Sequence, residues 1–252
     1  MTQRDIATVV AGMDARLVRM PPERSPQRVF LDTYRRTTLA VGKAIDDAQF
    51  EDPEWVERWD VTFADLYLAA LDLDLAGSPE VPRPWRLAFD APASLPALRH
   101  VLLGINAHIN YDLPQALLAV IGDDEFLDSL VVARRRRDHE RIDGVLSGRV
   151  AAEDDELGAL SARTLVDRLL QPLNRLSSKR FLREARQKVW HNTVELQQAR
   201  LAGEQVYAAR LAELEVLSAA RIADLLAPGQ VLLRLAVAGF GVSLPPPPAS
   251  AP

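Results

Sequence analysis

The 252-residue sequence contains no cysteine. This absence excludes disulfide frameworks, thiolate zinc sites, cysteine nucleophiles and iron–sulfur clusters. Long apolar runs are also missing, because stretches such as Ala116 to Ile121 fall well short of the roughly 18 residues that a membrane-spanning helix needs. Neither sign of charge dominates, since 30 Lys and Arg residues oppose 35 Asp and Glu residues for a net charge of −5. We therefore expect no membrane span and no general attraction to nucleic acid.

Several catalytic motifs are absent as well. The sequence has no HExxH, no GxGxxG that opens a helix after a strand, no GxxxxGK and no GxSxG. These absences argue against zincin, dinucleotide-binding, P-loop and hydrolase-elbow enzymes. Charges at Arg4, Asp5, Asp14 and Arg16 interrupt the apolar core that a signal peptide requires. We therefore expect a cytoplasmic protein.

Apolar residues recur at helical spacing almost throughout, and the β-branched clusters typical of hairpins are missing. This pattern predicts an all-α protein, a single bundle of about seven helices with short connections. We expect residues 1–242 to form this one domain. The expected helices span residues 3–19, 26–48, 53–75, 95–121, 125–147, 155–176 and 178–226.

Proline and glycine mark the expected breaks. Asp52 precedes Pro53, an arrangement that favours a helix start at residue 53. The Pro-rich residues 77–96 predict an irregular crossover. The acidic residues 151–156 predict a short linker, and the Pro-rich residues 243–252 predict a disordered tail.

The segment of residues 98–117 is the most informative, because it is largely apolar yet carries several polar groups. His108 and Asp112 are one helical turn apart and are therefore direct neighbours. Pro114 removes a backbone hydrogen bond, which predicts a kink around residues 110–113. Buried polar groups in a kink must bind one another, water or a ligand. His100 and Gly104 lie toward the same side of this helix as the His–Asp pair, and Asn106 and Asn110 lie on another side.

Three of the four histidines have an acidic residue four positions later, in the pairs His108–Asp112, His139–Asp143 and His191–Glu195. Such a pair on a helix can bind one metal ion or form a surface ion pair. We expect His139 to face water, because it stands in the charged run of residues 134–141. Asn192 falls within the apolar stripe of its helix and is expected to point inward.

An aromatic stripe on the helix at 53–75 includes Trp59 and Tyr67. Asp60 lies at the border of this stripe, and a buried Asp needs a partner. The stripe is interpreted either as plain core or as the lining of a ligand site.

Three stretches carry a resemblance to a known family. They are Leu103-Gly-Ile-Asn-Ala-His-Ile-Asn-Tyr-Asp-Leu-Pro114, Phe50-Glu-Asp-Pro-Glu-Trp55 and Asp60-Val-Thr-Phe-Ala-Asp-Leu-Tyr67. Together they resemble a bacterial, largely actinobacterial, family of helical proteins defined as a domain of unknown function. The resemblance covers residues 25–240 and implies an all-helical fold, with no activity attached to it. The scarcity of Lys relative to Arg suits a GC-rich bacterial source.

A second resemblance rests on motif spacing. Gly104, His108 and Asp112, followed by His191 and Glu195, are similar to the Gly-x3-His-x3-Asp and His-x3-Glu motifs of zinc-dependent phospholipases C and single-strand nucleases. This resemblance implies a metal-activated water that attacks a phosphodiester. Those enzymes use more than four histidine ligands, so the expectation here is limited to a one-metal or two-metal site.

Two functional hypotheses follow. In the first, the protein is a metal-dependent hydrolase-like enzyme with His108 and Asp112 as catalytic residues and a divalent metal as cofactor. The residues assigned to the metal are His108, Asp112, Asp60, His191 and Glu195, and those assigned to the substrate are Asn106, Asn110, Asn192, Trp59 and Tyr67. In the second, it is a non-catalytic helical module that binds an apolar small molecule or a partner helix. In a third, structural interpretation, the polar cluster only stabilises the kink.

Overall fold

The computed structural model describes residues 5–158 and 187–227, and all regular secondary structure in these ranges is helical, as predicted. The α-helices are α1 (Ile6–Arg19), α2 (Ser25–Asp46), α3 (Pro53–Leu75), α4 (Arg83–Phe89), α5 (Ala97–Ala107), α6 (Leu113–Val120), α7 (Ser129–Gly158) and α9 (Glu204–Leu226). Residues 187–202 are also helical and lead into α9. Short 3-10 turns occur at η1 (Pro22–Arg24) and η3 (Glu125–Leu127), and η2 (His108–Asp112) is a π-helical turn between α5 and α6.

Local sequence explains where the first helices begin. The Asp5 side chain accepts a hydrogen bond from the Thr8 backbone N–H at the start of α1. The Asp52 side chain caps α3 in the same way, by accepting from the Trp55 backbone N–H. Pro53 occupies the first turn of α3, where its missing N–H costs nothing. The predicted bounds of α3 are therefore confirmed.

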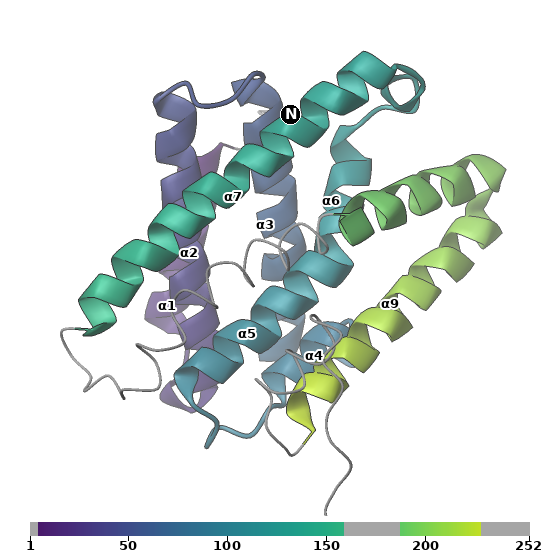
Figure 1. Ribbon diagram of the computed structural model, residues 1–252. Helices are drawn as coiled ribbons and strands as arrows, with labels where there is room; N and C mark the ends of the chain where they lie inside the picture. Colours follow the sequence, from purple (N-terminus) through teal and green to yellow (C-terminus); the bar gives the residue numbers. More distant parts are fainter. Residues whose placement is uncertain (1–4, 159–186, 228–252) are drawn as a thin grey trace, which may run out of the picture.

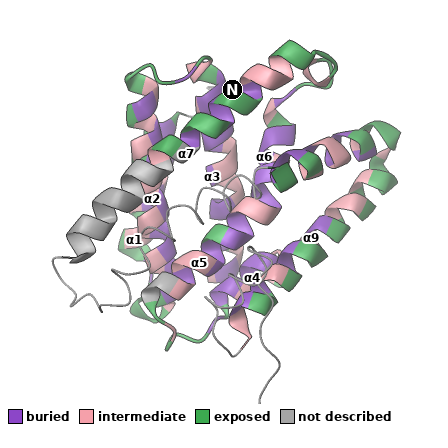
Figure 2. Cartoon of the chain, viewed as in Figure 1, coloured by how far each residue is buried: buried purple, intermediate pink, exposed green. Residues whose placement is uncertain are grey.

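Helix α3 is the centre of the bundle. It packs against α1, α2, α4 and α6, while α5 packs against α2 (Figure 1). α7 crosses over α2, and α9 packs against α4 and α5. Because neighbours surround α3, many of its residues are buried (Figure 2). Among them, Trp55, Tyr67 and Leu71 have no exposed surface.

The crossover at residues 77–96 contains a helix that the proline pattern did not predict. Pro84 lies in the first turn of α4, where proline is compatible with a helix. The side chains of Trp85 and Phe89 in this helix are buried. The prolines therefore bound a short helix here instead of preventing one.

Two predicted boundaries in the C-terminal half are wrong. Residues 151–156 are helical within α7 and form no linker. The helix expected at 178–226 is interrupted at Gly203, whose φ of 126° is accessible to glycine alone without strain. Most of the helix expected at 155–176 and all of the tail expected at 243–252 lie outside the described residues.

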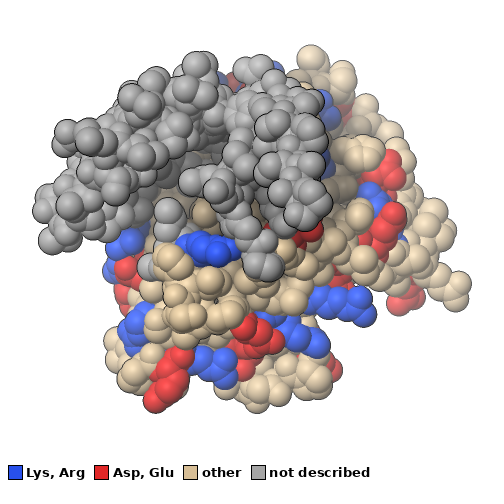
Figure 3. Space-filling view, turned by 60° about the horizontal axis from the view of Figure 1, so that its bottom comes forward, with Lys and Arg blue, Asp and Glu red and all other residues tan. Residues whose placement is uncertain are grey.

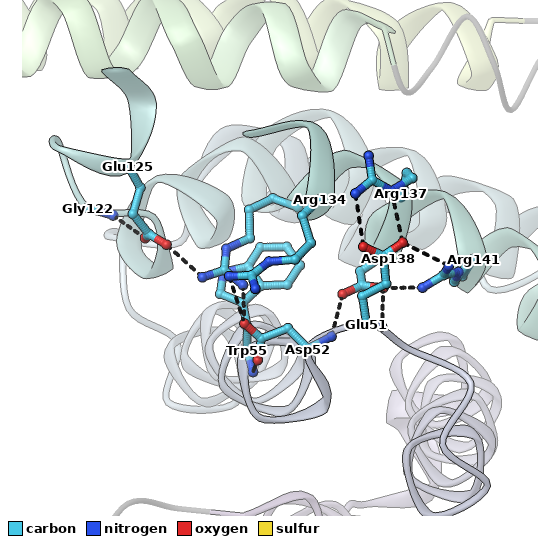
Figure 4. Close-up of polar contacts among 10 residues, drawn as sticks. Glu51, Asp52, Trp55, Gly122, Glu125, Arg134, Arg137, Asp138 and Arg141 are labelled. Atoms are coloured by element: carbon cyan, nitrogen blue, oxygen red, sulfur yellow. Dashed lines mark hydrogen bonds and ion pairs between the residues drawn. The ribbon is translucent and has the colours of Figure 1, made fainter. Parts of the chain in front are cut away.

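The charged run at residues 134–141 attaches α7 to the start of α3 (Figure 4). The buried Asp138 carboxylate accepts hydrogen bonds from the backbone N–H groups of Glu51 and Asp52, at 2.8 and 2.9 Å. Arg137 and Arg141 both pair with Glu51, and Arg135 pairs with Asp52 and Glu125. The expectation that this run faces water is therefore wrong for its inner side. Asp52, the N-cap of α3, and Glu125 of η3 compensate the buried Arg135, and Arg141 compensates the buried Asp138.

On the face shown in Figure 3, acidic and basic side chains lie intermixed. Within the described ranges, no helix has the length and apolarity needed to cross a membrane.

Candidate functional site

The π-helical turn η2 accommodates Pro114. The Leu113 backbone N–H donates to the carbonyl of His108, five residues earlier, in place of the usual four. The predicted kink region thus holds a wide turn that re-forms backbone hydrogen bonds around the proline. π-turns of this kind are frequent at functional sites because they displace side chains from the regular helical positions.

Three amide side chains satisfy carbonyls near this turn. Asn106 donates to the carbonyl of Leu102, and Asn110 donates to the carbonyl of Asn106, both at 2.8 Å. Gln115 donates to the carbonyl of Tyr111 at 2.8 Å. The two asparagines, expected to contact substrate, therefore bind their own helix.

His108 and Asp112 form a buried pair at the centre of η2. His108 Nδ1 lies 2.8 Å from Asp112 Oδ2, and the two side chains are only 4% and 3% exposed. The indole Nε1–H of Trp85, on α4, donates to the same carboxylate oxygen at 2.8 Å. Asp112 thus fixes the orientation of the imidazole and is itself held by Trp85. His108 Nε2 is buried and has no hydrogen-bond partner.

Five aromatic rings enclose the imidazole of His108. The Phe63 ring lies parallel to it, with 3.5 Å between the centroids and an angle of 4° between the planes. Tyr34 meets it edge-on at 4.7 Å. Phe30, Tyr67 and Trp85 lie at 6.4, 5.9 and 5.8 Å. Phe63 is half-buried, whereas the other four rings are buried.

This enclosure changes the ionisation of the pair. Burial lowers the pKa of His108, because the imidazolium form loses its hydration, and the Asp112 carboxylate partly opposes that shift. Burial raises the pKa of Asp112, opposed by the hydrogen bonds from His108 and Trp85. We therefore expect a neutral imidazole near pH 7, and the two N–H donors to Asp112 favour its carboxylate form against the effect of burial.

Further buried polar atoms next to these rings lack partners. They include the hydroxyl oxygen of Tyr67 and the carboxylate oxygen Oδ2 of Asp60, while the hydroxyl groups of Tyr34 and Thr38 interact only with each other. Each unsatisfied buried polar atom costs about 1–3 kcal/mol. Folded proteins leave few of them without water or another partner. Tyr34 and Tyr67 carry two of these hydroxyl groups on rings that border His108.

Residues 6–228 match the model of DUF5995, a family of unknown function. The chain belongs to this family. No curated protein sequence and no solved structure matches it. The expected resemblance to an all-helical family without a known activity is confirmed, and the pair His108 and Asp112 lies within the matched DUF5995 region.

The remaining site residues expected in this DUF5995 chain are not joined to the pair. His191 is exposed and Glu195 is half-buried on the helical segment 187–202. Asn192, on the same segment, accepts a hydrogen bond from Arg210 of α9. Among the residues that the structure describes, no three His, Asp or Glu side chains are grouped so that they could hold a metal ion.

His139 and Trp59 belong to a second aromatic contact. His139 is buried, accepts a hydrogen bond from the indole Nε1–H of Trp190 at 3.0 Å, and meets Trp59 edge-on at 5.2 Å. Trp59 also stacks on Trp55 and on Phe63, so it links this contact to the ring beside His108. Of the two aromatic residues expected to contact substrate, Tyr67 lies beside His108 and Trp59 lies one ring further away.

Sequence reasoning missed Tyr34, Phe30 and Trp85 in the site of this DUF5995 chain. One signal for Phe30 exists in retrospect, which is Gly104. A Cβ at this glycine would lie 2.3 Å from the Phe30 ring, so the absence of a side chain makes room for that ring. No comparable signal marks Trp85, because its role depends on how α4 packs against η2.

Proposed function

We propose that this chain binds a small molecule with a flat apolar body and one hydrogen-bonding group, which pairs with His108 Nε2. The observation that supports this proposal is that His108 Nε2 is buried and has no hydrogen-bond partner, while Nδ1 is fixed by Asp112. Preorganised polar groups inside an apolar enclosure are typical of small-molecule sites. Aromatic faces supply binding energy for a flat body, and the polar atom supplies orientation and specificity.

Phe63 is the side chain that gives access. It is the half-buried ring of the enclosure and covers one face of the imidazole. A rotation of this ring would expose His108 without unfolding a helix. Side-chain and loop motions of this kind commonly admit ligands to buried sites.

The test compares phenol with toluene, two probes that differ in one hydroxyl group. We expect phenol to raise the melting temperature of the wild-type protein more than toluene does, and His108→Gln to abolish the difference. His108→Asn, which keeps a donor near the position of Nδ1 but has no atom at the position of Nε2, provides a second variant in case His108→Gln unfolds. His191→Gln is the matched control because that histidine is exposed. Equal effects of both probes on the wild-type protein would refute the proposal.

Hydrolysis at the same site is a second candidate, favoured by the His108–Asp112 pair itself. An imidazole oriented by a carboxylate is the usual arrangement of a general base. With Nδ1 engaged by Asp112, only Nε2 remains for a metal ion. Near-stoichiometric metal in the purified protein, lost together with ester hydrolysis in His108→Gln, would support a metal-dependent enzyme. Absence of both metal and hydrolysis would eliminate this candidate.

A further inference from the structure

Three oxygen-bearing side chains are buried at the seam between α2 and α3. Tyr34 and Thr38 are one turn apart on α2 and therefore share a face, and Asp60 lies on α3. Their exposed fractions are 7%, 0% and 5%. The Tyr34 ring meets Phe63 of α3 with 6.2 Å between the centroids, and Asp60 lies one helical turn before Phe63. The Tyr34 and Thr38 hydroxyl groups interact only with each other, and Asp60 Oδ2 has no hydrogen-bond partner.

Asp60 differs from the other buried acids of the described residues. Asp74 is bound by Arg24 and Gln27, and Asp112 and Asp138 each accept two N–H donors. No described residue donates to Asp60 or forms an ion pair with it, and the neighbouring charge that acts on it, Glu57, has the same sign. A buried carboxylate without a donor is costly unless a ligand supplies one.

The chemistry of the missing partner follows from the atoms present. A carboxylate oxygen accepts, and both hydroxyl oxygens can accept. A protonated amine carries three N–H donors and one positive charge, and so matches three acceptors that include one carboxylate. The rings of Tyr34, Trp59 and Phe63 border this seam, and aromatic faces attract cations.

We propose that Asp60, Tyr34 and Thr38 form a subsite for a protonated amine, which makes the ligand of this protein an amine with an aromatic or similar flat body. This inference rests on the proposed function, because Tyr34 connects the two parts. Its ring meets the imidazole of His108 with 4.7 Å between the centroids, and its other ring contact, with Phe63, lies one helical turn from Asp60. One molecule can therefore place its ring near His108 and its ammonium group at Asp60.

The experiment measures the binding of benzylamine and benzyl alcohol at pH 8 by calorimetry. In the wild-type protein we expect benzylamine to bind at least about tenfold more tightly than benzyl alcohol, because only the amine pairs with the carboxylate. Asp60→Asn should reduce this preference to about onefold. The control is Asp74→Asn, a second buried acid on α3 that is already paired, and it should keep the preference. If Asp60→Asn does not fold, Thr38→Val removes one acceptor and should weaken benzylamine binding alone.

The outcomes separate this inference from the proposed function. If phenol binding depends on His108 but benzylamine and benzyl alcohol bind equally well, the amine subsite is wrong and the proposed function stands. If benzylamine binding depends on Asp60 but His108→Gln leaves phenol binding unchanged, the subsite stands and the proposed function is wrong. If sodium or potassium chloride weakens benzylamine binding to the wild-type protein by occupying the site at Asp60, the subsite binds simple cations and the amine proposal is refuted.

Discussion

Asp60 makes a testable contribution to stability as a single residue. Burial raises its pKa to about 7, chiefly because the carboxylate loses hydration, with a smaller effect of Glu57. Since the pKa in the folded protein exceeds the unfolded value near 4, the stabilising contribution is complete below about pH 4 and is lost as the pH rises toward 7. The loss amounts to about 4 kcal/mol. We expect Asp60→Asn to remove it, so that the variant gains stability relative to wild type as the pH rises from 4 to 8.

Urea unfolding at several pH values measures this effect. His108 has the opposite dependence, because its lowered pKa causes stability to be lost as the pH falls below about 6.5. The difference between Asp60→Asn and wild type isolates the contribution of Asp60. Asp72→Asn is the control on α3, since it removes the ion pair of this exposed acid with Arg16 of α1, and it should change the pH dependence of stability less than Asp60→Asn does. A curve for Asp60→Asn parallel to that of wild type would contradict the prediction.

Gly104 provides a second prediction at the residue scale. A methyl group there would lie 2.3 to 2.7 Å from three atoms of the Phe30 ring, closer than any normal contact. Gly104→Ala should therefore destabilise the protein by about 1–3 kcal/mol, despite the better helix propensity of alanine. Adding Phe30→Leu should recover part of this loss, because the two positions are in contact.

Gly144 offers the matched control for Gly104, since it also lies within a helix. Nothing lies within 4 Å of a Cβ at this position. Gly144→Ala should stabilise the protein by about 0.5–1 kcal/mol. Denaturant unfolding of both variants measures the changes in the free energy of unfolding. If Gly104→Ala and Gly144→Ala change it in the same direction, packing against Phe30 does not determine the effect at Gly104.

At the scale of elements, α7 depends on Asp138 for its attachment to α3. This carboxylate has no exposed surface and accepts the backbone N–H groups of Glu51 and Asp52. Asp138→Asn leaves one of these donors unsatisfied and should cost about 2–3 kcal/mol. Glu51→Gln, which weakens the more exposed pairs with Arg137 and Arg141, should cost less than about 1 kcal/mol.

Hydrogen exchange provides the direct measurement for this attachment. The amides of Glu51 and Asp52 should exchange faster in Asp138→Asn. The exchange rates of the amides within α3 should change only as far as the global free energy of unfolding changes. Unchanged protection at both amides would mean that the carboxylate does not hold them in solution.

Sequence patterns predict individual elements better than they predict contacts between elements. Asp52 and Pro53 encode the start of α3 locally, and the spacing of His108 and Asp112 encodes their contact, because one helical turn joins them. Trp85 could not be predicted as a partner of Asp112, since the two residues meet through the packing of α4 on the π-turn. His191 has the same spacing to an acid as His108 but lies on the surface.

The buried charges of α7 also show that sequence patterns do not predict contacts between distant elements. The charged run on α7 is indistinguishable in sequence from a solvated helix face. Arg135 and His139 on its inner side are buried because the N-cap of α3 and η3 provide acids for Arg135, and the helical segment 187–202 provides Trp190 for His139. Such compensation becomes visible only once distant segments are placed side by side.

At the scale of the whole molecule, the buried apolar residues of the described ranges form two clusters, and this division predicts unequal stability. The larger one includes Ile222 and Leu225 at the end of α9. The smaller one is formed by Tyr111, Leu118, Leu196 and Leu214, between the start of α9, the preceding helical segment and the π-turn. Because few apolar contacts hold this part, we expect the residues around Gly203 to open without global unfolding.

Native-state hydrogen exchange in low urea tests that expectation. Amides near residues 207–212 should show a lower free energy of opening than amides in the middle of α3. Leu214→Ala should lower the free energy of opening near residues 207–212 by about a further 2 kcal/mol. Leu217→Ala is the control on the same helix, since that side chain is 56% exposed and should change the value by less than about 0.5 kcal/mol. If the amides near residues 207–212 and those of α3 exchange with one common free energy, the two clusters unfold as a single unit. In that case Leu214 would stabilise the site around His108 as directly as the aromatic residues of α3 do.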